Sequence, residues 1–253
     1  MKFQTDRTRA AEIRMRREET AKEPPRVILE RIKQREIDFP LLDDAIRSRE
    51  NPLVGEIGAG YCQIILNLID KHNLPAAIAF DISAESLEFS TYVSENLFRS
   101  HPARRLMLVP GDILETGLDF WGKFDVLVII ATAHHFPDPL PLYVRAYQML
   151  KPGGVMYFDR EALRSWIGLH ELARNRTGLK TFWTNMQQRR MGILETQFSL
   201  KVWLRALNLF DWQARVKWPG TDVEFDLKCL TRWERFLVQL IGGRVYGLCS
   251  KTR

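Results

Sequence analysis

Between residues 50 and 160 the chain alternates short apolar runs with stretches whose apolar residues recur at helical spacing. The apolar runs at 53–57, 76–81, 106–109, 124–131 and 155–158 predict strands. Helices are predicted between these runs. The run at 124–131 is nearly continuous in apolar residues, which is typical of a strand buried on both faces of a parallel sheet. The alternation therefore predicts an α/β fold, a mostly parallel sheet with helices on both faces.

The first predicted strand ends in a glycine turn, Glu56-Ile57-Gly58-Ala59-Gly60, which leads directly into a predicted helix. A strand, a tight turn and a helix in this order open a nucleotide-binding α/β fold. Gly58 and Gly60 carry no Cβ, so the backbone can bend sharply there and a ligand can come close to it. We therefore expect the ligand site to be centred on this turn.

The residues around the turn favour a cationic ligand over a dinucleotide. A dinucleotide site would have a third glycine at position 63, where this chain has Gln63, and Glu56 would repel the pyrophosphate. S-Adenosylmethionine has no phosphate and carries an ammonium and a sulfonium, so a carboxylate at position 56 suits it. The residues around the turn therefore favour S-adenosylmethionine over a dinucleotide as the ligand.

Carboxylates also end the second and third predicted strands. Asp81 is placed to accept hydrogen bonds from both ribose hydroxyls, and Ile82 would lie flat on the adenine. Asp112 would accept a hydrogen bond from the adenine 6-amino group, with Ile113 in apolar contact. The alternatives are structural. Asp81 would be a helix cap, although Ser83 already fills that role, and Asp112 would belong to a Gly-Asp turn.

The order of these motifs resembles the class I S-adenosylmethionine-dependent methyltransferases over roughly residues 50–160. The resemblance rests on Glu56-Ile57-Gly58-Ala59-Gly60, Asp81, Gly111-Asp112-Ile113, His134-His135-Phe136 and Leu150-Lys151-Pro152-Gly153-Gly154. It implies a seven-stranded, Rossmann-like sheet with an antiparallel strand pair, 211–218 and 244–249, at one edge. It also implies S-adenosylmethionine as cofactor, S-adenosylhomocysteine as product, and contact of Ala59 and Ala131 with the cofactor. The chain departs from the family turn at Cys62, where a third glycine is usual.

Methyl transfer from a sulfonium is an in-line displacement in which positioning supplies most of the acceleration. A base is needed only if the acceptor must lose a proton. His134 and His135 follow the fourth predicted strand, so one of them is a candidate base; the alternative is that they only shape the loop. Glu161 and His170 are weaker candidates. A metal site formed by His134, His135 and Asp138 is disfavoured, because adjacent histidines in one loop rarely bind the same metal.

The residues of the turn after the fourth predicted strand also exclude some classes of methyl acceptor. Residues 131–134 lack the Asn/Asp-Pro-Pro-aromatic turn typical of adenine and glutamine methyltransferases. They also lack the Pro-Cys nucleophile of cytosine C5 enzymes and the carboxylates of metal-dependent catechol-type enzymes. A small-molecule oxygen, nitrogen or carbon acceptor remains.

The flanking segments are expected to add helices to the fold. Residues 1–50 are predicted to form a helical extension that covers the active site or acts as a structural brace, and residues 51–253 the methyltransferase domain. After the fifth strand we expect a helix over 161–174 and helical insertions near 175–197 and 219–243. Six of the seven tryptophans fall at or after Trp166, where they line a substrate pocket or fill the core.

The net charge of +6 divides into +2 over residues 1–50, −5 over 51–159 and +9 over 160–253. The basic C-terminal part keeps open the alternative of an RNA or protein methyltransferase, but the basic residues are scattered and no RNA-binding module is recognisable. A non-catalytic, cofactor-binding interaction protein is the other alternative. Three widely spaced cysteines, no apolar leader and no membrane-length apolar run predict a cytoplasmic protein without a membrane partner. The oligomeric state is left open.

Overall fold

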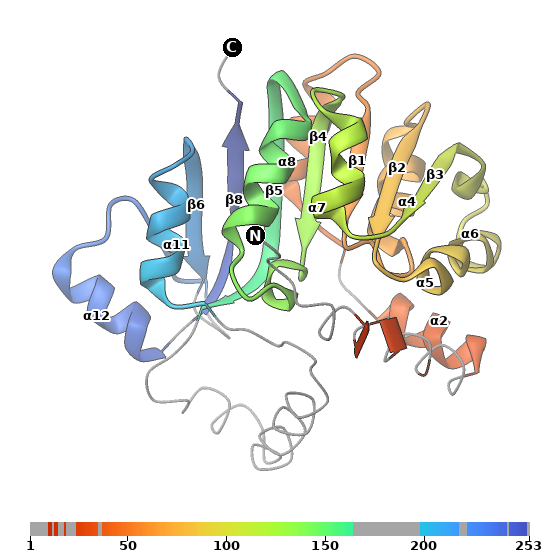
Figure 1. Cartoon of the computed structure of the whole chain (residues 1–253). Coiled ribbons are helices and arrows are strands. Elements are labelled where there is room, and N and C mark those ends of the chain that lie inside the picture. Colours follow the sequence, from red (N-terminus) through yellow and green to blue (C-terminus); the bar gives the residue numbers. More distant parts are fainter. Residues whose placement is uncertain are drawn as a thin grey trace.

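The computed structural model describes residues 10, 11, 13, 14, 18, 24–34, 37–163, 198–217, 222–241 and 243–251. Within them a single eight-stranded sheet has the strand order β3-β2-β1-β4-β5-β8-β6-β7, with helices on both faces (Figure 1). The strands are β1 (Val54–Ile57), β2 (Ala77–Asp81), β3 (Leu106–Pro110), β4 (Phe124–Ile130), β5 (Leu150–Leu163), β6 (Trp212–Lys217), β7 (Glu224–Asp226) and β8 (Gly243–Ser250).

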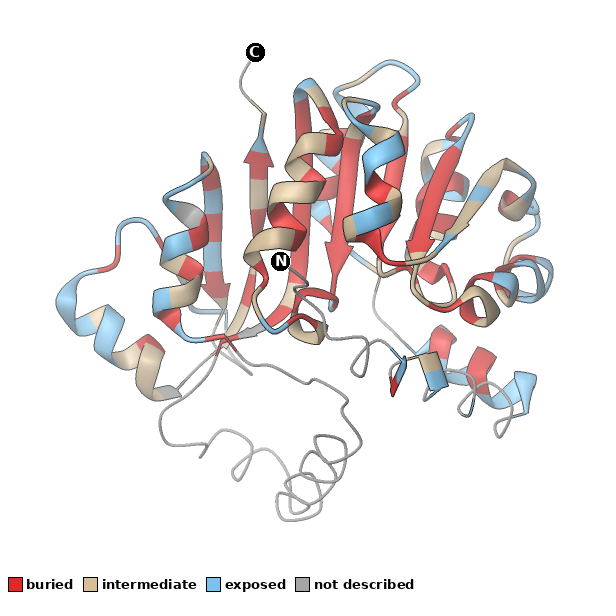
Figure 2. Cartoon of the chain, viewed as in Figure 1, coloured by how far each residue is buried: buried red, intermediate tan, exposed pale blue. Residues whose placement is uncertain are grey.

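The five strands β1 to β5 are parallel neighbours, so the predicted α/β fold is confirmed. Strand β4 is buried over most of its length, as its apolar run predicts, and among the described residues burial is concentrated in the central strands (Figure 2). Leu127 and Ile129 pack into one apolar cluster, while Val126 and Val128 pack into a second. Since successive side chains of a strand point to opposite faces, the two clusters are the cores on the two sides of the sheet.

Helices connect the strands close to the predicted positions. Ser83 caps α5 by accepting the N–H of Ser86 with its side chain, as the sequence predicts. The α-helices are α2 (Pro25–Lys33), α3 (Pro40–Arg47), α4 (Gln63–His72), α5 (Ala84–Glu88), α6 (Ser90–Leu97), α7 (Ile113–Thr116), α8 (Leu140–Met149), α11 (Leu200–Leu207) and α12 (Arg232–Ile241). Short 3₁₀ helices are η1 (Pro102–Arg105), η2 (Gly117–Phe120) and η3 (Ala133–His135).

The antiparallel edge has one strand more than the seven-stranded sheet that we expected. Strand β8 lies between β5 and β6 and is antiparallel to both, which confirms the predicted pair. Strand β7 then adds to the outside of β6, where Phe225 pairs with Val216. This eighth strand and helix α12 lie within the range 219–243.

The helix expected over 161–174 does not begin at Glu161. Strand β5 continues to Leu163, and residues 161–163 pair with Val245, Arg244 and Gly243 of β8. Backbone pairing to a long neighbouring strand outweighs the local helical preference of this segment. Residues 164–174 lie outside the described residues, as does the insertion predicted near 175–197.

The N-terminal helices α2 and α3 share an apolar cluster with β1 and α4. Ile28, Ile32 and Leu42 are buried in it. A polar anchor adds to this packing, because Asp43 accepts hydrogen bonds from Lys71 at 2.6 Å and pairs with His72 at 2.7 Å. Burial opposes ionisation of Asp43, but these two bonds outweigh it and hold the pKa of Asp43 below its usual value.

In the part of the chain that the structure describes, none of the helices has the length and apolar character needed to span a membrane.

Candidate active site

The glycine turn after β1 is fastened to the neighbouring strand β2 by backbone hydrogen bonds. The N–H groups of Gly58 and Ala59 donate to the carbonyl oxygen of Phe80, at 2.8 and 3.0 Å. The N–H of Gly60 donates to Asp81 Oδ2 at 2.7 Å. The turn and the Asp81 side chain are therefore fixed to each other, although they come from different strands.

Both glycines of the turn adopt the left-handed backbone region, with φ of +73° at Gly58 and +51° at Gly60. A Cβ on Gly58 would lie 2.2 Å from Thr132 Oγ1, so a larger residue does not fit. A Cβ on Gly60 would meet no atom within 4 Å, which leaves open space against the backbone. Cys62, at the third glycine position of the family, also has a positive φ of +59°. The sequence departs from the family there while the backbone conformation remains one that favours glycine.

Asp81 ends strand β2, and Asp112 follows the end of the neighbouring strand β3 by two residues and caps α7. Asp81 Oδ1 accepts the N–H of Ser83 at 2.9 Å, and Asp112 Oδ1 accepts the N–H of Leu114 at the start of α7, also at 2.9 Å. The N–H of Gly111 donates to the carbonyl oxygen of Asp81 at 2.8 Å and joins the two strand ends. Both carboxylates therefore order the surrounding backbone, and both also line a common cavity.

This first cavity lies at the carboxyl ends of β1 to β4, beside the point where the strand order reverses between β1 and β4. In doubly wound sheets this is where ligands bind. Most of the predicted cofactor residues line it: Gly58, Gly60, Asp81, Ile82, Asp112, Ile113 and Ala131. The remaining two, Glu56 and Ala59, line the adjoining cavity.

The second cavity lies between the glycine turn, the loop after β4, the end of β5 and the N-terminal segment. Its polar lining includes Glu56, His134, His135 and Arg160, and its apolar lining includes Ile32, Ile37, Ile64 and Ile130. The two cavities share Gly58, Gly60, Ala131 and His135. They therefore meet at the glycine turn and at the loop that carries the histidines.

Glu56 is buried at the base of the glycine turn, with 2% of its surface exposed. Its Oε2 accepts the N–H of Ile65 in α4 at 3.0 Å. Burial raises the pKa of Glu56 to about 8; the Ile65 N–H opposes this rise, and the negative charge of Asp81 adds to it. A cation that reached Glu56 would favour the ionised carboxylate.

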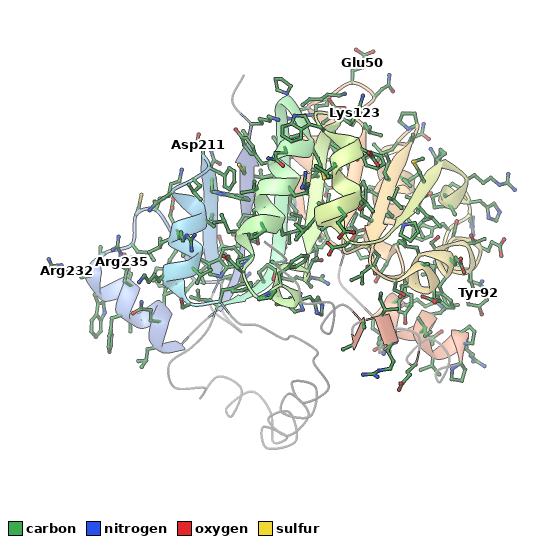
Figure 3. The ribbon with its side chains drawn as sticks, in the orientation of Figure 1. Glu50, Tyr92, Lys123, Asp211, Arg232 and Arg235 are labelled. Carbon is green, nitrogen blue, oxygen red and sulfur yellow. The ribbon has the colours of Figure 1, made fainter. Side chains whose placement is uncertain are left out.

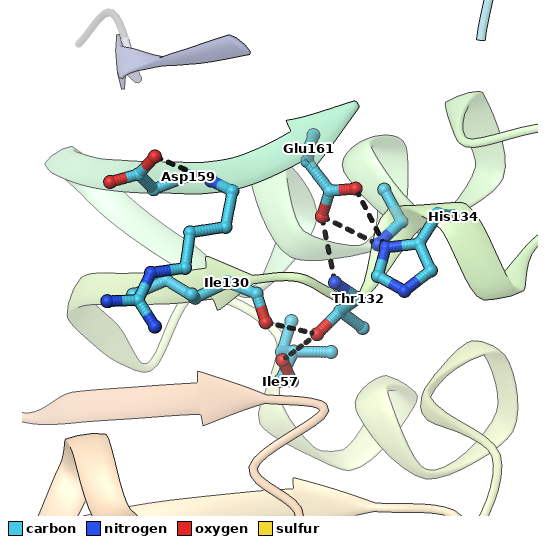
Figure 4. Close-up of polar contacts among 8 residues, drawn as sticks. Ile57, Ile130, Thr132, His134, Asp159 and Glu161 are labelled. Carbon is cyan, nitrogen blue, oxygen red and sulfur yellow. Dashed lines mark hydrogen bonds and ion pairs between the residues drawn. The ribbon is translucent and has the colours of Figure 1, made fainter. Parts of the chain in front are cut away.

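Glu161 of β5 holds the loop that carries the two histidines, as the dashed lines in Figure 4 show. Its Oε1 accepts the N–H groups of Thr132 and Ala133, both at 2.8 Å, and its Oε2 lies 3.3 Å from His134 Nδ1. Glu161 is completely buried. The sequence interpretation named it only as a weak candidate base, whereas these contacts make it the residue that positions the loop.

Thr132 joins the same loop to the glycine turn. Its hydroxyl lies 3.2 Å from the carbonyl oxygen of Ile57 and 3.0 Å from that of Ile130, and these oxygens are its acceptors (Figure 4). Ala131 precedes it with a positive φ of +51°, and its N–H donates to the carbonyl oxygen of Asp159 at 2.9 Å. The loop is thus held from β1 on one side and from β5 on the other.

The two candidate histidines have different surroundings. Their ring centroids are 4.2 Å apart. His134 contacts Glu161 and lines the second cavity alone, whereas His135 lines both cavities and so lies where they meet. The geometry therefore distinguishes the histidines, although their positions in the sequence are equivalent. His170, the other predicted candidate, lies outside the described residues.

The sequence interpretation missed Arg160, which also lines the second cavity. It has a positive φ of +58°, at the point where the register of β5 with β8 shifts. Its guanidinium carbon lies 5.4 Å from the centroid of the Phe39 ring. No motif marks Arg160 in the sequence, and only its place after the fifth apolar run could have drawn attention to it.

The tryptophans that the structure describes do not line either cavity. Trp203 and Trp212 are buried in the core behind β5, where Phe158 stacks on Trp203 at 5.5 Å. Trp121 and Trp233 are exposed. Across the described residues no three metal-ligating side chains gather into a group, and Asp138 instead accepts the N–H of Leu140 at the start of α8.

A family model described as a methyltransferase domain matches residues 55–158. No curated protein matches the sequence. Similar solved structures include a SAM-dependent methyltransferase from Methanosarcina mazei, with 14% identity and a TM-score of 0.56 over 86% of this chain and 99% of that chain. A putative sarcosine dimethylglycine methyltransferase from Galdieria sulphuraria has 14% identity and a TM-score of 0.56 over 84% and 82%. A complex of the Haloferax volcanii Trm112 methyltransferase activator with a putative methyltransferase has 16% identity and a TM-score of 0.52 over 83% and 88%. At these identities the likeness is one of fold.

Proposed function

We propose that the chain is a class I S-adenosylmethionine-dependent methyltransferase that methylates a small-molecule oxygen, nitrogen or carbon atom, and the methyltransferase-domain match over residues 55–158 and the fold support this. The observation that carries this proposal is the first cavity, where the glycine turn, Asp81 and Asp112 come together from three strand ends. The transfer is an in-line displacement, and the chain contributes to it mainly by holding the two reactants in position.

The residues present fit the cofactor. Open space beside Gly60 allows a ligand to lie against the backbone, and the polar side chains that surround it are carboxylates, which suit a ligand with hydroxyl donors and positive charge. In this proposal Asp81 binds the ribose hydroxyls, Asp112 accepts from the adenine amino group, and Glu56 lies nearest the ammonium. When bound, S-adenosylmethionine supplies a methyl group that its sulfonium has already activated.

The acceptor enters the second cavity in this proposal. His135 is the better placed of the two candidate bases because it lies where the cavities meet. If the acceptor must lose a proton, the proton moves to a ring nitrogen of this histidine. Glu161 contributes by holding the loop rather than by touching the acceptor, because both of its oxygens are engaged by loop atoms.

Two observations favour a small acceptor over nucleic acid: the apolar lining of the second cavity, and the distance of two basic residues of the C-terminal part from the cavities. Ile32 and Ile37 of the N-terminal segment line that cavity, so a compact apolar body fits it. Arg232 and Arg235 of the basic C-terminal part project from α12, at the end of the sheet far from β2 and β3 (Figure 3).

Calorimetric titration of the purified protein with S-adenosylmethionine, S-adenosylhomocysteine and NAD tests the proposal. Micromolar binding of the first two, without binding of NAD, is the expected result and would justify a screen of small-molecule acceptors by methyl transfer. If none of the three binds, the chain does not use this cofactor by itself, and the non-catalytic interaction protein becomes the better proposal.

A further inference from the structure

We propose that Arg160 selects the acceptor: it binds an anionic group, a carboxylate or a phosphate, on an acceptor with an apolar body. This inference rests on the proposed function, because it takes the second cavity as the acceptor site. It adds a substrate class and a specificity-determining residue that the cofactor motifs do not provide.

The backbone at Arg160 is held in a conformation that a non-glycine residue rarely adopts. Its φ is +58°, in the left-handed region that is unfavourable for a residue with a Cβ. Neighbouring contacts maintain it: the N–H of Arg160 donates to Asp159 Oδ1 at 2.5 Å, and Asp159 accepts from Arg244 Nε at 2.6 Å and from the hydroxyl of Tyr157 at 2.8 Å. Strain that the surroundings enforce in this way is common at ligand sites.

The strand order places Arg160 on the acceptor side of the glycine turn. Ile57 of β1 pairs with Ile129 of β4, which pairs with Phe158 of β5, two residues before Arg160. Since neighbouring strands lie about 4.8 Å apart, Arg160 begins about 10 Å across the sheet from the turn. Asp81 lies on the other side of β1, at the end of β2. Arg160 is therefore remote from the predicted ribose site, and the loop with the histidines lies between.

The charge and shape of the second cavity point to an amphipathic acceptor. Among the described lining residues, Glu56 carries the only carboxylate and Arg160 the only side chain that is always cationic. The proposed function assigns Glu56 to the cofactor ammonium, so a positive side chain faces the acceptor. The isoleucines of the lining supply the apolar contact.

The guanidinium of Arg160 is also in contact with an aromatic ring. It lies over the ring of Phe39, which packs against Tyr157 at 5.8 Å between ring centroids. The guanidinium is planar by its own delocalised bonding, and contact with the ring restricts where this planar fork lies; the fork matches the two oxygens of a carboxylate or phosphate.

Three probes of equal ring size test this inference: benzoate, phenyl phosphate and the neutral benzamide. Each is titrated by calorimetry into the protein saturated with S-adenosylhomocysteine, whose own binding is measured first. The variants are Arg160→Met, which keeps the apolar stem and the backbone strain, and Arg160→Lys. Arg104→Met, which removes an exposed arginine of η1 near the opposite edge of the sheet, is the matched control.

We expect at least one anionic probe to bind the wild type about tenfold or more tightly than benzamide. Arg160→Met should lose this preference, Arg160→Lys should keep part of it, and Arg104→Met should keep all of it. S-Adenosylhomocysteine should bind every variant within about twofold of the wild type.

Equal binding of anions and benzamide to the wild type, or no binding of either anion, overturns the inference and leaves the proposed function intact. A loss of S-adenosylhomocysteine affinity in Arg160→Met that matches the loss of anion affinity also overturns it, because Arg160 would then bind the cofactor carboxylate. If S-adenosylhomocysteine does not bind the wild type, the proposed function fails, and this inference fails with it.

Discussion

The two cavities meet at the glycine turn but are built in different ways. In the first cavity the two carboxylates lie at or just after the ends of their own strands, and their nearest partners are within a few residues or on the next strand: Asp81 accepts from Gly60 and Ser83, and Asp112 accepts from Leu114. The second cavity is assembled from the N-terminal segment, the loop after β4 and the distant end of β5. The first cavity, the proposed cofactor side, is therefore held mainly by neighbouring turns and strand ends, and the second cavity, the proposed acceptor side, by long-range packing.

The largest effect is expected where the two sides touch, at Gly58. In Gly58→Ala the new Cβ meets Thr132 Oγ1 at 2.2 Å, in addition to the cost of a positive φ. We expect a loss of about 2–5 kcal/mol in the free energy of unfolding, measured by urea denaturation. Gly122→Ala is the control, because its φ of +65° is similar but its Cβ meets nothing within 4 Å. Equal losses of unfolding free energy in both variants would show that the contact of the new Cβ with Thr132 adds nothing to the cost of the positive φ.

The next largest effect separates the two histidines on the acceptor side. Because His135 lines both cavities, we expect His135→Ala to lower kcat by about 100-fold with an acceptor that must lose a proton. His134→Ala should lower it much less. The kcat of each variant is measured at saturating S-adenosylmethionine. Full turnover in both variants would exclude a histidine base and leave positioning as the mechanism.

On the proposed cofactor side, Asp81→Ala should weaken S-adenosylmethionine binding by about tenfold to 100-fold, because the ribose would lose the charged acceptor that we propose for it. Calorimetry measures this affinity. Asp81→Asn keeps an oxygen for one of the two N–H groups that Asp81 now accepts, so it should lose less. An affinity that both substitutions leave unchanged would remove Asp81 from the cofactor site.

A substitution at Glu161 should change the proposed acceptor side while leaving the proposed cofactor side unchanged. Glu161→Gln keeps an oxygen for the N–H groups of Thr132 and Ala133 but removes the negative charge beside His134. We expect kcat to fall by about tenfold while the affinity for S-adenosylmethionine stays within about twofold. An equal loss of kcat and cofactor affinity would mean that the two sides are not separable at this loop.

The smallest effect is a pH dependence that originates at Glu56. Its carboxyl ionises near pH 8 in the free protein, and a bound cation favours the ionised form. The affinity for S-adenosylmethionine should therefore rise about threefold from pH 7.5 to 8.5, and Glu56→Gln should abolish the rise. Calorimetry at the two pH values measures both, and an identical rise in Glu56→Gln would assign the dependence to another group.

The same shift has a consequence for the stability of the free protein. Glutamate in the unfolded chain ionises near its ordinary pKa of 4.5, well below the pKa of folded Glu56. The folded state therefore binds the extra proton between these values, and the contribution of Glu56 to the free energy of unfolding falls as pH rises from about 4.5 to about 8. Denaturation of Glu56→Gln over this range should show a flatter profile than that of the wild type.

The sequence by itself determined the parallel half of the sheet, the glycine turn and the carboxylates at the strand ends. Each of these features depends on a short stretch of sequence: an apolar run, a pair of glycines, or an acid at the end of a strand. The extension of β5 through Glu161 to Leu163 could not be predicted in this way, because it depends on pairing with β8, about 80 residues later. The same is true of the eighth strand, which forms only by addition to β6.

The residues of the candidate site also divide into those that the sequence predicts and those that only the tertiary structure identifies. Glu56, Gly58, Gly60, Asp81 and Asp112 follow from motifs, because each is positioned by its own strand and turn. The buried role of Glu161, the strained backbone of Arg160 and the difference between His134 and His135 were decided only by the tertiary structure. Their common physical cause is the pairing of β5 with two strands far apart in the sequence. Strand β5 pairs with β4 up to Asp159 and with β8 on both sides of a register shift between Phe158 and Glu161, and Arg160 and Glu161 lie at that shift.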